Sequence, residues 1–301
     1  TAAEQELTTS PAIANAVDAS VTAAVAELLG DQQIWAAADQ TLTTLLTDLL
    51  GDQPVQDAVA DWVATAVNER LGFGPISVVG DQIGAAVVTL ITNPVIQTGL
   101  IGVLDTLISD FFGTTGVVNA FSQAAGTLAS AALTGDLTTV WPQVQEALRA
   151  NTDVQAGIQT AVVDAVAAFL GDTAVWTAVD QTLSATIRTL TSDPTVLDAI
   201  ATTISEQVTT ALGEPLGAAV GPQVGAAVAA LISNPAVVNG LLGVADTLVS
   251  DFISAFGVVP ALSDTAGEFA LALLTGATLA EAITAAEQEL TTSPAIANAV
   301  D

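Results

Sequence analysis

Internal repetition is the feature that most limits how this chain can fold. Residues 284–301 (TAAEQELTTSPAIANAVD) repeat residues 1–18 letter for letter, so residue 284 corresponds to residue 1 and the sequence has a period of 283. So long an identical stretch does not arise by chance, and the sequence therefore holds one full period and begins a further copy. Copies of this kind are typical of repeat architectures, in which each unit buries its apolar face on its neighbours.

An older duplication lies inside this period. Two pairs of segments match at the same offset, 141: 28–42 (LLGDQQIWAAADQTL) with 169–183 (FLGDTAVWTAVDQTL), and 91–111 (ITNPVIQTGLIGVLDTLISDF) with 232–252 (ISNPAVVNGLLGVADTLVSDF). The shared offset predicts two homologous repeat units, A and B.

The repeats also predict where the units begin and end. Unit A is expected at residues 10–150 and unit B at residues 151–291. Residues 1–9 are then the end of a preceding repeat, and residues 292–301 the start of the next copy. Each unit contains about seven segments of similar length, of which 10–30 (SPAIANAVDASVTAAVAELLG), 31–51 and 52–72 are the first three.

Each segment is predicted to be an α-helix. In the segment that begins at Asp52, apolar residues recur at a spacing of four, at Val55, Val59, Val63, Val67 and Leu71. This spacing lines one face of a helix and would scatter over both faces of a strand. Val, Ile and Thr are mediocre helix formers, so these helices should depend on packing.

Capping residues support the predicted boundaries. Some stand directly before a proline that suits the first helical turn, and others follow a glycine that ends the preceding helix. The predicted structural helix caps are Ser10, Asp31, Asp52, Asn93, Asp172, Asp193 and Asn234.

These patterns predict an all-α fold: a tandem array of about fourteen short antiparallel helices in two homologous seven-helix units. A solenoid-like stack and a chain of linked bundles both fit. The links between the predicted helices are short, which predicts that helices adjacent in sequence are antiparallel neighbours in space.

The fourth and fifth helices of each unit are the most apolar, and residues 82–104 and 215–245 carry no charge. A membrane span needs about twenty apolar residues. Asn93-Pro94, Gly221-Pro222 and Asn234-Pro235 are expected to divide these stretches into pieces too short to cross alone. We therefore expect helices that are buried on most sides within their unit.

Composition excludes several classes of function. The chain has 32 acidic and three basic residues, for a formal charge of −29, so binding to nucleic acid is excluded and an anionic membrane surface would repel it. It has no His or Cys, which removes most metal sites, thiol nucleophiles and imidazole bases. We predict no enzyme activity, no catalytic residue, no metal site and no cofactor.

The remaining candidates favour structural roles. Trp35 and Trp176 occupy equivalent places and are expected to anchor helices to one another. Asp39 and Asp180 recur in both units, as do Asp105 and Asp246, and are expected to solvate the surface; a Ca²⁺ site is a weaker alternative without an EF-hand loop.

The expected function is a non-catalytic repeat of a long extracellular or cell-surface fibre, stalk or adhesin. Its partners would be adjacent copies of the same repeat, joined end to end. The high negative charge would keep such arrays soluble and apart. With 51% apolar residues, a helical binder of lipid or another apolar ligand is the alternative, and a membrane-inserted helix array is a further one.

Overall fold

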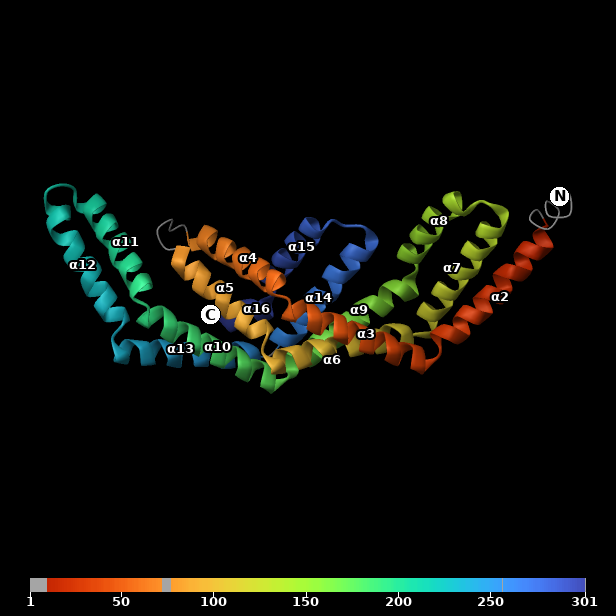
Figure 1. Cartoon of the computed structure of the whole chain (residues 1–301), viewed down its shortest axis with the longest axis horizontal. Coiled ribbons are helices and arrows are strands. Elements are labelled where there is room, and N and C mark those ends of the chain that lie inside the picture. Colours follow the sequence, from red (N-terminus) through yellow and green to blue (C-terminus); the bar gives the residue numbers. More distant parts are fainter. Residues whose placement is uncertain (1–9, 72–76, 256, 301) are drawn as a thin grey trace. The chain divides into compact units, whose positions relative to one another are not determined.

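The computed structural model describes residues 10–71, 77–255 and 257–300, which form fifteen α-helices and no strand (Figure 1). The predicted all-α helical array is confirmed. The helices are α2 Pro11–Leu29, α3 Gln32–Gly51, α4 Gln53–Leu71, α5 Ser77–Ile91, α6 Pro94–Gly113, α7 Thr115–Thr134, α8 Leu137–Ala150, α9 Thr152–Gly171, α10 Thr173–Ser192, α11 Pro194–Leu212, α12 Leu216–Ile232, α13 Pro235–Ser254, α14 Val258–Thr275, α15 Leu279–Thr292 and α16 Pro294–Val300.

The helix boundaries follow the internal duplication. When α2 to α7 are shifted by the offset that relates the two repeats, their ends coincide with those of α9 to α14 or differ by one or two positions. α8 and α15 are equivalent at an offset one larger, because the link that follows Gly276 is longer by one residue than the link that follows Gly135. α16 then has the sequence with which α2 begins.

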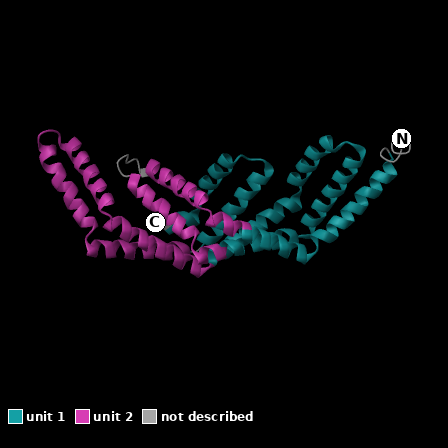
Figure 2. Cartoon of the chain, viewed as in Figure 1, with its two compact units in different colours: residues 1–44, 100–171, 255–301 teal, residues 45–99, 172–254 magenta. Residues whose placement is uncertain are grey.

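By contacts, the chain divides into two compact units that each combine helices from both repeats (Figure 2). Unit 1 takes the described parts of residues 1–44, 100–171 and 255–301, and unit 2 takes those of residues 45–99 and 172–254. A compact unit of the structure is therefore assembled from equivalent parts of the two sequence repeats.

In unit 1, the most extensive contacts pair α2 with α7 and α9 with α14. These helices are equivalent pairs, and neither pair is adjacent in sequence. A glycine lies at the same place in each: a Cβ at Gly126 would meet the main-chain oxygen of Asp18, and one at Gly267 would meet Val163 Cγ2 at 2.7 Å. The prediction that helices adjacent in sequence are neighbours in space therefore does not account for the main pairs of unit 1, in which a glycine at the contact lets helices far apart in sequence approach closely.

In unit 2, the most extensive contacts are between sequence neighbours, α4 with α5 and α11 with α12. A glycine again allows the close approach of the two helices in each pair, since Cβ atoms at Gly84 and Gly225 would collide with the main chain of Ala60 and Ala201. The prediction of antiparallel sequence neighbours therefore applies to these two hairpins. α10 lies against both α5 and α13.

The core is built mainly from small side chains near the starts of helices. Five valines are almost fully buried: Val117, Val154, Val175, Val196 and Val258. The prediction that the fifth helix of each repeat is buried on most sides is wrong. Ile96 is the buried residue of α6 and Ala245 that of α13.

Two of the three predicted divisions are present, because Pro94 and Pro235 each begin a new helix, and the third is absent. Pro222 lies inside α12, so Gly221-Pro222 does not divide that helix. Pro94 and Pro235 begin α6 and α13, each of 20 residues. Among the described helices, α2, α6, α9, α13 and α14 are long and apolar enough to cross a membrane by length and composition. The expectation of pieces too short to cross is therefore wrong for α6 and α13.

Candidate functional sites

The seven predicted caps all lie immediately before a helix. Five accept a hydrogen bond through a side-chain oxygen from the backbone N–H of the second residue after them, at 2.8–2.9 Å: Asp31, Asn93, Asp172, Asp193 and Asn234. At Ser10 the side chain makes no capping bond, and the main-chain oxygen of Ser10 accepts from the backbone N–H groups of Ile13 and Ala14. The main-chain oxygen of Asp52 likewise accepts from Val55 and Gln56.

Two caps lie outside the predicted set. Asn151 accepts from the backbone N–H groups of Asp153 and Val154. Thr278 forms a reciprocal capping box with Glu281 at the start of α15. The sequence signal for the second was present, since a threonine stands three positions before a glutamate.

We call a packing contact between helices of successive repeats a joint. The first joint is formed by α9, the first helix of repeat B. It contacts α7 and α8, the last two helices of repeat A. Gly116 at the start of α7 lies so close to Asp153 that a Cβ would come within 2.5 Å of its carboxyl carbon. Gly157 of α9 lies in the same way against Val117.

The same contact recurs at α16, whose sequence repeats the start of α2. α16 contacts α14 and α15, which are equivalent to α7 and α8. A Cβ at Gly257 would lie 3.2 Å from that of Ala295, and these residues correspond to Gly116 and Asp153 of the first joint. α16 therefore packs on the end of repeat B as α9 packs on the end of repeat A.

A second contact between the repeats brings α10 of repeat B against α5 of repeat A. The two helices line a narrow cleft of about 170 Å³, between Gln82, Ala85, Ala86 and Thr89 on α5 and Thr182, Ala185, Thr186 and Thr189 on α10. At its end, Gln82 Nε2 donates to Asp193 Oδ2 at 3.4 Å. Asp193 also caps α11 through its other oxygen, which accepts from the backbone N–H of Thr195. One carboxylate therefore stabilises both the helix start and the contact with α5.

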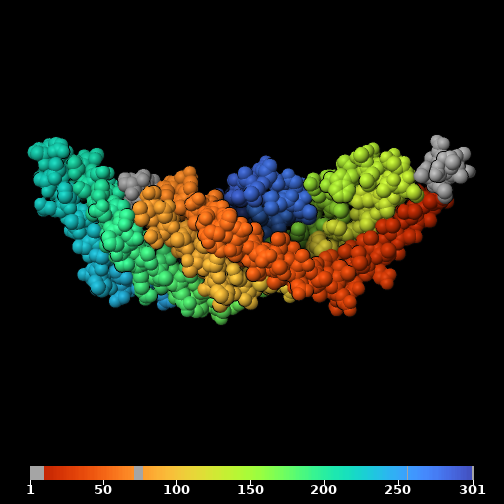
Figure 3. Space-filling model, in the orientation of Figure 1, coloured from red at the N-terminus to blue at the C-terminus, as the bar shows by residue number. Residues whose placement is uncertain are grey.

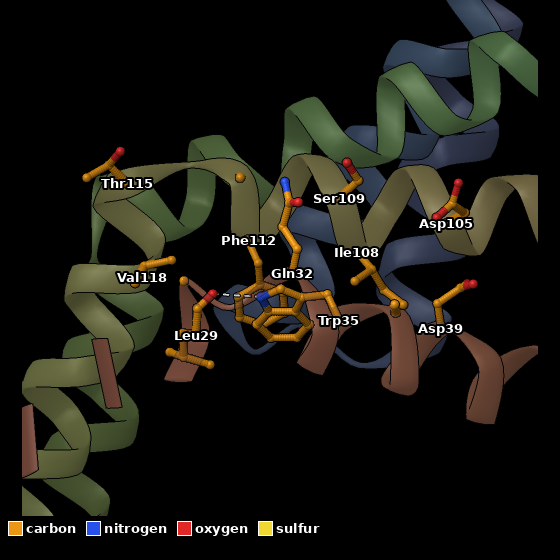
Figure 4. Close-up of a pocket in the computed structure, with 13 residues that line it drawn as sticks. Leu29, Gln32, Trp35, Asp39, Asp105, Ile108, Ser109, Phe112, Thr115 and Val118 are labelled. Atoms are coloured by element: carbon orange, nitrogen blue, oxygen red, sulfur yellow. Dashed lines mark hydrogen bonds between the residues drawn. The ribbon is translucent and has the colours of Figure 1, made fainter. Parts of the chain in front are cut away.

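Two equivalent pockets hold the recurring Trp and Asp residues. The larger, of about 690 Å³, lies between α3 and α6 (Figure 4). The Trp35 ring stacks on that of Phe112 with centroids 3.8 Å apart, and its indole N–H donates to the oxygen of Leu29 at 2.6 Å. Asp39 and Asp105 line the end of the pocket away from Thr115.

The second pocket, of about 330 Å³, lies between α10 and α13. Trp176, Asp180 and Asp246 line it at the positions equivalent to Trp35, Asp39 and Asp105, and Ile253 stands in the place of Phe112. Sequence reasoning singled out these Trp and Asp residues separately and missed that they meet. The offset that they share was the signal that could have joined them.

One carboxylate oxygen in each pocket is buried without a hydrogen-bond partner in the described structure, Oδ1 of Asp39 and Oδ1 of Asp180. Such an oxygen can accept from an ordered water or from a donor on a ligand. Over the described residues, no group of three or more His, Cys, Asp or Glu side chains is placed to hold a metal ion.

Two glutamates of α15 have shifted pKa values. Hydrogen bonds from the backbone and side chain of Thr278 lower the pKa of Glu281. The pKa of Glu289 is raised, chiefly by a hydrogen bond with the Glu268 side chain, with added repulsion from Glu268 and Asp264 of α14. The α14–α15 pair thus contains a cluster of like charges.

No protein-family model, curated protein or solved structure matches this chain.

Proposed function

We propose that this chain is a non-catalytic segment of a long tandem helical array, in which identical copies join end to end. The observation that carries the proposal is the repeated joint: α16 contacts α14 and α15, as α9 contacts α7 and α8. Since α16 has the sequence of the start of α2, the same packing can follow from one period to the next.

Composition supports an extracellular or cell-surface location for such an array, as a fibre, stalk or adhesin. The formal charge of −29 makes copies of the array repel one another, which favours end-to-end growth over lateral association. Three arginines and no lysines offer trypsin-like proteases few cleavage sites.

The test compares chains of one, two and three periods by small-angle X-ray scattering and electron microscopy. The expected result is a particle whose maximum dimension grows by a constant increment per period. Globules that move independently on flexible connections would contradict the proposal. A two-period chain with a long Gly/Ser linker between its copies is the matched control, because it contains the same two copies and lacks a continuous joint.

The second candidate function is binding of a lipid or another apolar ligand. It is favoured by the two Trp pockets and by the apolar face of α13, on which Leu241, Val244 and Leu248 are 43%, 57% and 61% exposed. Native mass spectrometry of the protein from its natural host should then show a co-purifying ligand. Flotation with vesicles of neutral lipid would test insertion of the apolar helices, and absence of both signals would rule against this alternative.

A further inference from the structure

α5 and α12 are equivalent helices with different surroundings. Both are held by a hairpin partner, α4 for α5 and α11 for α12. α5 is also covered by α10, the second helix of the following repeat. The helix that would cover α12 in the same way is the second helix of the next copy, which is α3 because the next copy repeats this chain from its start.

The exposure of α12 agrees with a missing neighbour. Gln82 and Ala86 of α5 are half-buried, and their equivalents Gln223 and Ala227 on α12 are exposed. Leu216 lies two turns before Gln223 on the same face and is 57% exposed. α12 and its hairpin partner α11 can be followed in Figure 3 (green to cyan). We call the face formed by Leu216, Gln223, Ala226, Ala227 and Ala230 the α12 docking face.

The proposed occupant shows the same difference. In α10, Val175 is 2% exposed and Ala178 is 4% exposed. The equivalent residues of α3 are Ile34, which is 39% exposed, and Ala37, which is exposed. Leu45, the equivalent of the half-buried Thr186, is 60% exposed. Leu45 thus presents an exposed apolar side chain where α10 lines its cleft with α5, and Ile34 and Ala37 lie on the same face of α3.

We propose that the α12 docking face binds α3 of the next copy, in the geometry by which α5 binds α10. The proposal rests on the proposed function, because it needs a following copy. The surfaces match chemically: the four cleft residues of α5 become Gln223, Ala226, Ala227 and Ala230, and those of α10 become Thr41, Thr44, Leu45 and Asp48. Leu45 then lies against alanines where the internal cleft has Thr186, and Asp48 brings a carboxylate to the place of Thr189.

A polar pair also carries over. Gln82 donates to Asp193 in the α5–α10 joint. The equivalent residues are Gln223 of one copy and Asp52 of the next, and both are exposed in this chain. The α12 docking face therefore supplies both an apolar contact and a donor for a specific acceptor, in a head-to-tail interface that can propagate.

Disulfide trapping in a two-period chain tests this arrangement, and the protein has no native cysteine to interfere. The test pair is A227C in the first period with L45C in the second. The positive control is A86C with T186C inside the first period, which lie across the observed cleft. The matched negative control is A218C with L45C, since Ala218 is exposed on α12 and lies off the docking face.

Under mild oxidation, the test pair should close within one chain about as completely as the positive control. It should exceed the negative control about tenfold, because docking raises the effective concentration of the two thiols. If the positive control closes and the test pair matches the negative control, the proposal is wrong. Scattering on the same chains distinguishes failure of α3 docking from failure of the tandem array. If the length grows by a constant increment per period but the test disulfide does not form, the docking of α3 is wrong and the tandem array stands.

A second measurement avoids dependence on disulfide geometry. A227E in the first period should lower the urea midpoint of the two-period chain, because it places a charge next to Leu45 and adds a second carboxylate to an interface that contains Asp48. A218E on the same helix should not. In the single-period chain both variants should leave the midpoint unchanged, since both alanines are exposed there. Equal midpoints for A227E and A218E in the two-period chain would overturn the proposal.

Discussion

At the residue scale, glycine sets how closely paired helices approach. Gly84 and Gly225 occupy equivalent places in the two hairpins of unit 2, and at each a Cβ would meet main-chain atoms of the neighbouring helix. The main chain of the neighbouring helix cannot move out of the way of an added Cβ, whereas a flexible side chain can adopt another rotamer. These glycines therefore fix the interhelical distance, whereas glycines with free space around them do not.

The first prediction follows from this difference. Gly225→Ala should destabilise the protein by about 1–3 kcal/mol, because the added methyl collides with Ala201 and forces the helices apart. Gly240→Ala on α13 is the control, since nothing lies within 4 Å of its Cβ position. It should be neutral or stabilising by up to about 1 kcal/mol through helix propensity. Urea unfolding followed by circular dichroism measures both, and equal effects would contradict the role of Gly225.

The second prediction concerns the like charges between α14 and α15. The pKa of Glu289 is raised in the folded protein by its hydrogen bond with Glu268 and by repulsion from Glu268 and Asp264. A raised folded-state pKa means that stability is present at low pH and is lost as the pH rises through that pKa. Glu289→Gln should therefore raise the melting temperature at pH 7, and the gain should vanish below about pH 4, where carboxyl groups are protonated.

Removal of any negative charge also relieves the net repulsion of this acidic chain. Glu146→Gln on α8 measures that general effect, because it removes one charge from the helix equivalent to α15. The gain from Glu289→Gln should exceed it at pH 7. Equal melting temperatures for the two variants across the pH range would show that the Glu289–Glu268 contact adds nothing specific.

At the element scale, the two Trp pockets show how equivalent helix pairs have diverged. α3 and α6 are joined by the Trp35–Phe112 stack, in which Phe111 and Phe121 also take part through edge contacts. Between α10 and α13 the position of Phe112 is taken by Ile253. The first pair of helices thus gains from ring stacking, and the second has an aliphatic side chain at the same place.

The third prediction concerns Trp35. Trp35→Ala should destabilise the protein by about 2 kcal/mol, since the side chain is half-buried and loses both its ring stack and its hydrogen bond to Leu29. About 1 kcal/mol of this loss belongs to the stack, the usual size of an aromatic pair. Urea unfolding measures the loss. Trp35→Phe should recover part of the loss by restoring the stack, and failure to do so would contradict this account.

The sequence predicted the elements well because their signals are local. The pairs Asn93-Pro94 and Asn234-Pro235 mark the starts of α6 and α13 to the residue. The pairing of α2 with α7 and of α9 with α14 was not predicted, because it depends on contacts between residues far apart in sequence. In the sequence, nothing distinguishes Gly126 from other small residues, and its role follows only from its contact with Asp18 and Thr22 of α2. The burial of α6 and α13 was misjudged for a related reason, since apolar composition does not say which neighbour is present.

The pockets were predicted in part: their residues were identified from the sequence, but their convergence was not. Trp35, Asp39, Asp105 and their equivalents were noticed because they recur, and recurrence at one offset is a signal that the sequence carries. Their convergence needed the pairing of α10 with α13, which no local pattern encodes. The stack of Trp35 on Phe112 was missed for the same reason.

At the scale of the whole molecule, stability should depend on the number of copies. In a quasi-one-dimensional array, stability is the sum of the intrinsic stability of each unit and the interaction at each interface between neighbours. Ile34 and Leu45 of α3 and Leu216 of α12 are exposed in the present chain, at 39%, 60% and 57%. An added copy would cover such residues at an internal joint and leave them exposed only at the two ends of the array.

The fourth prediction is therefore that the urea midpoint rises from one period to two and rises by a smaller step from two to three. The second copy adds a first interface between copies to those already inside the period, and later interfaces add proportionally less per copy. The two-period chain with a Gly/Ser linker between its copies should melt close to the single period if joint packing, and not chain length, provides the gain. Identical midpoints for one, two and three periods would show that the copies fold as independent beads, and the exposed faces of α3 and α12 would then need a different partner.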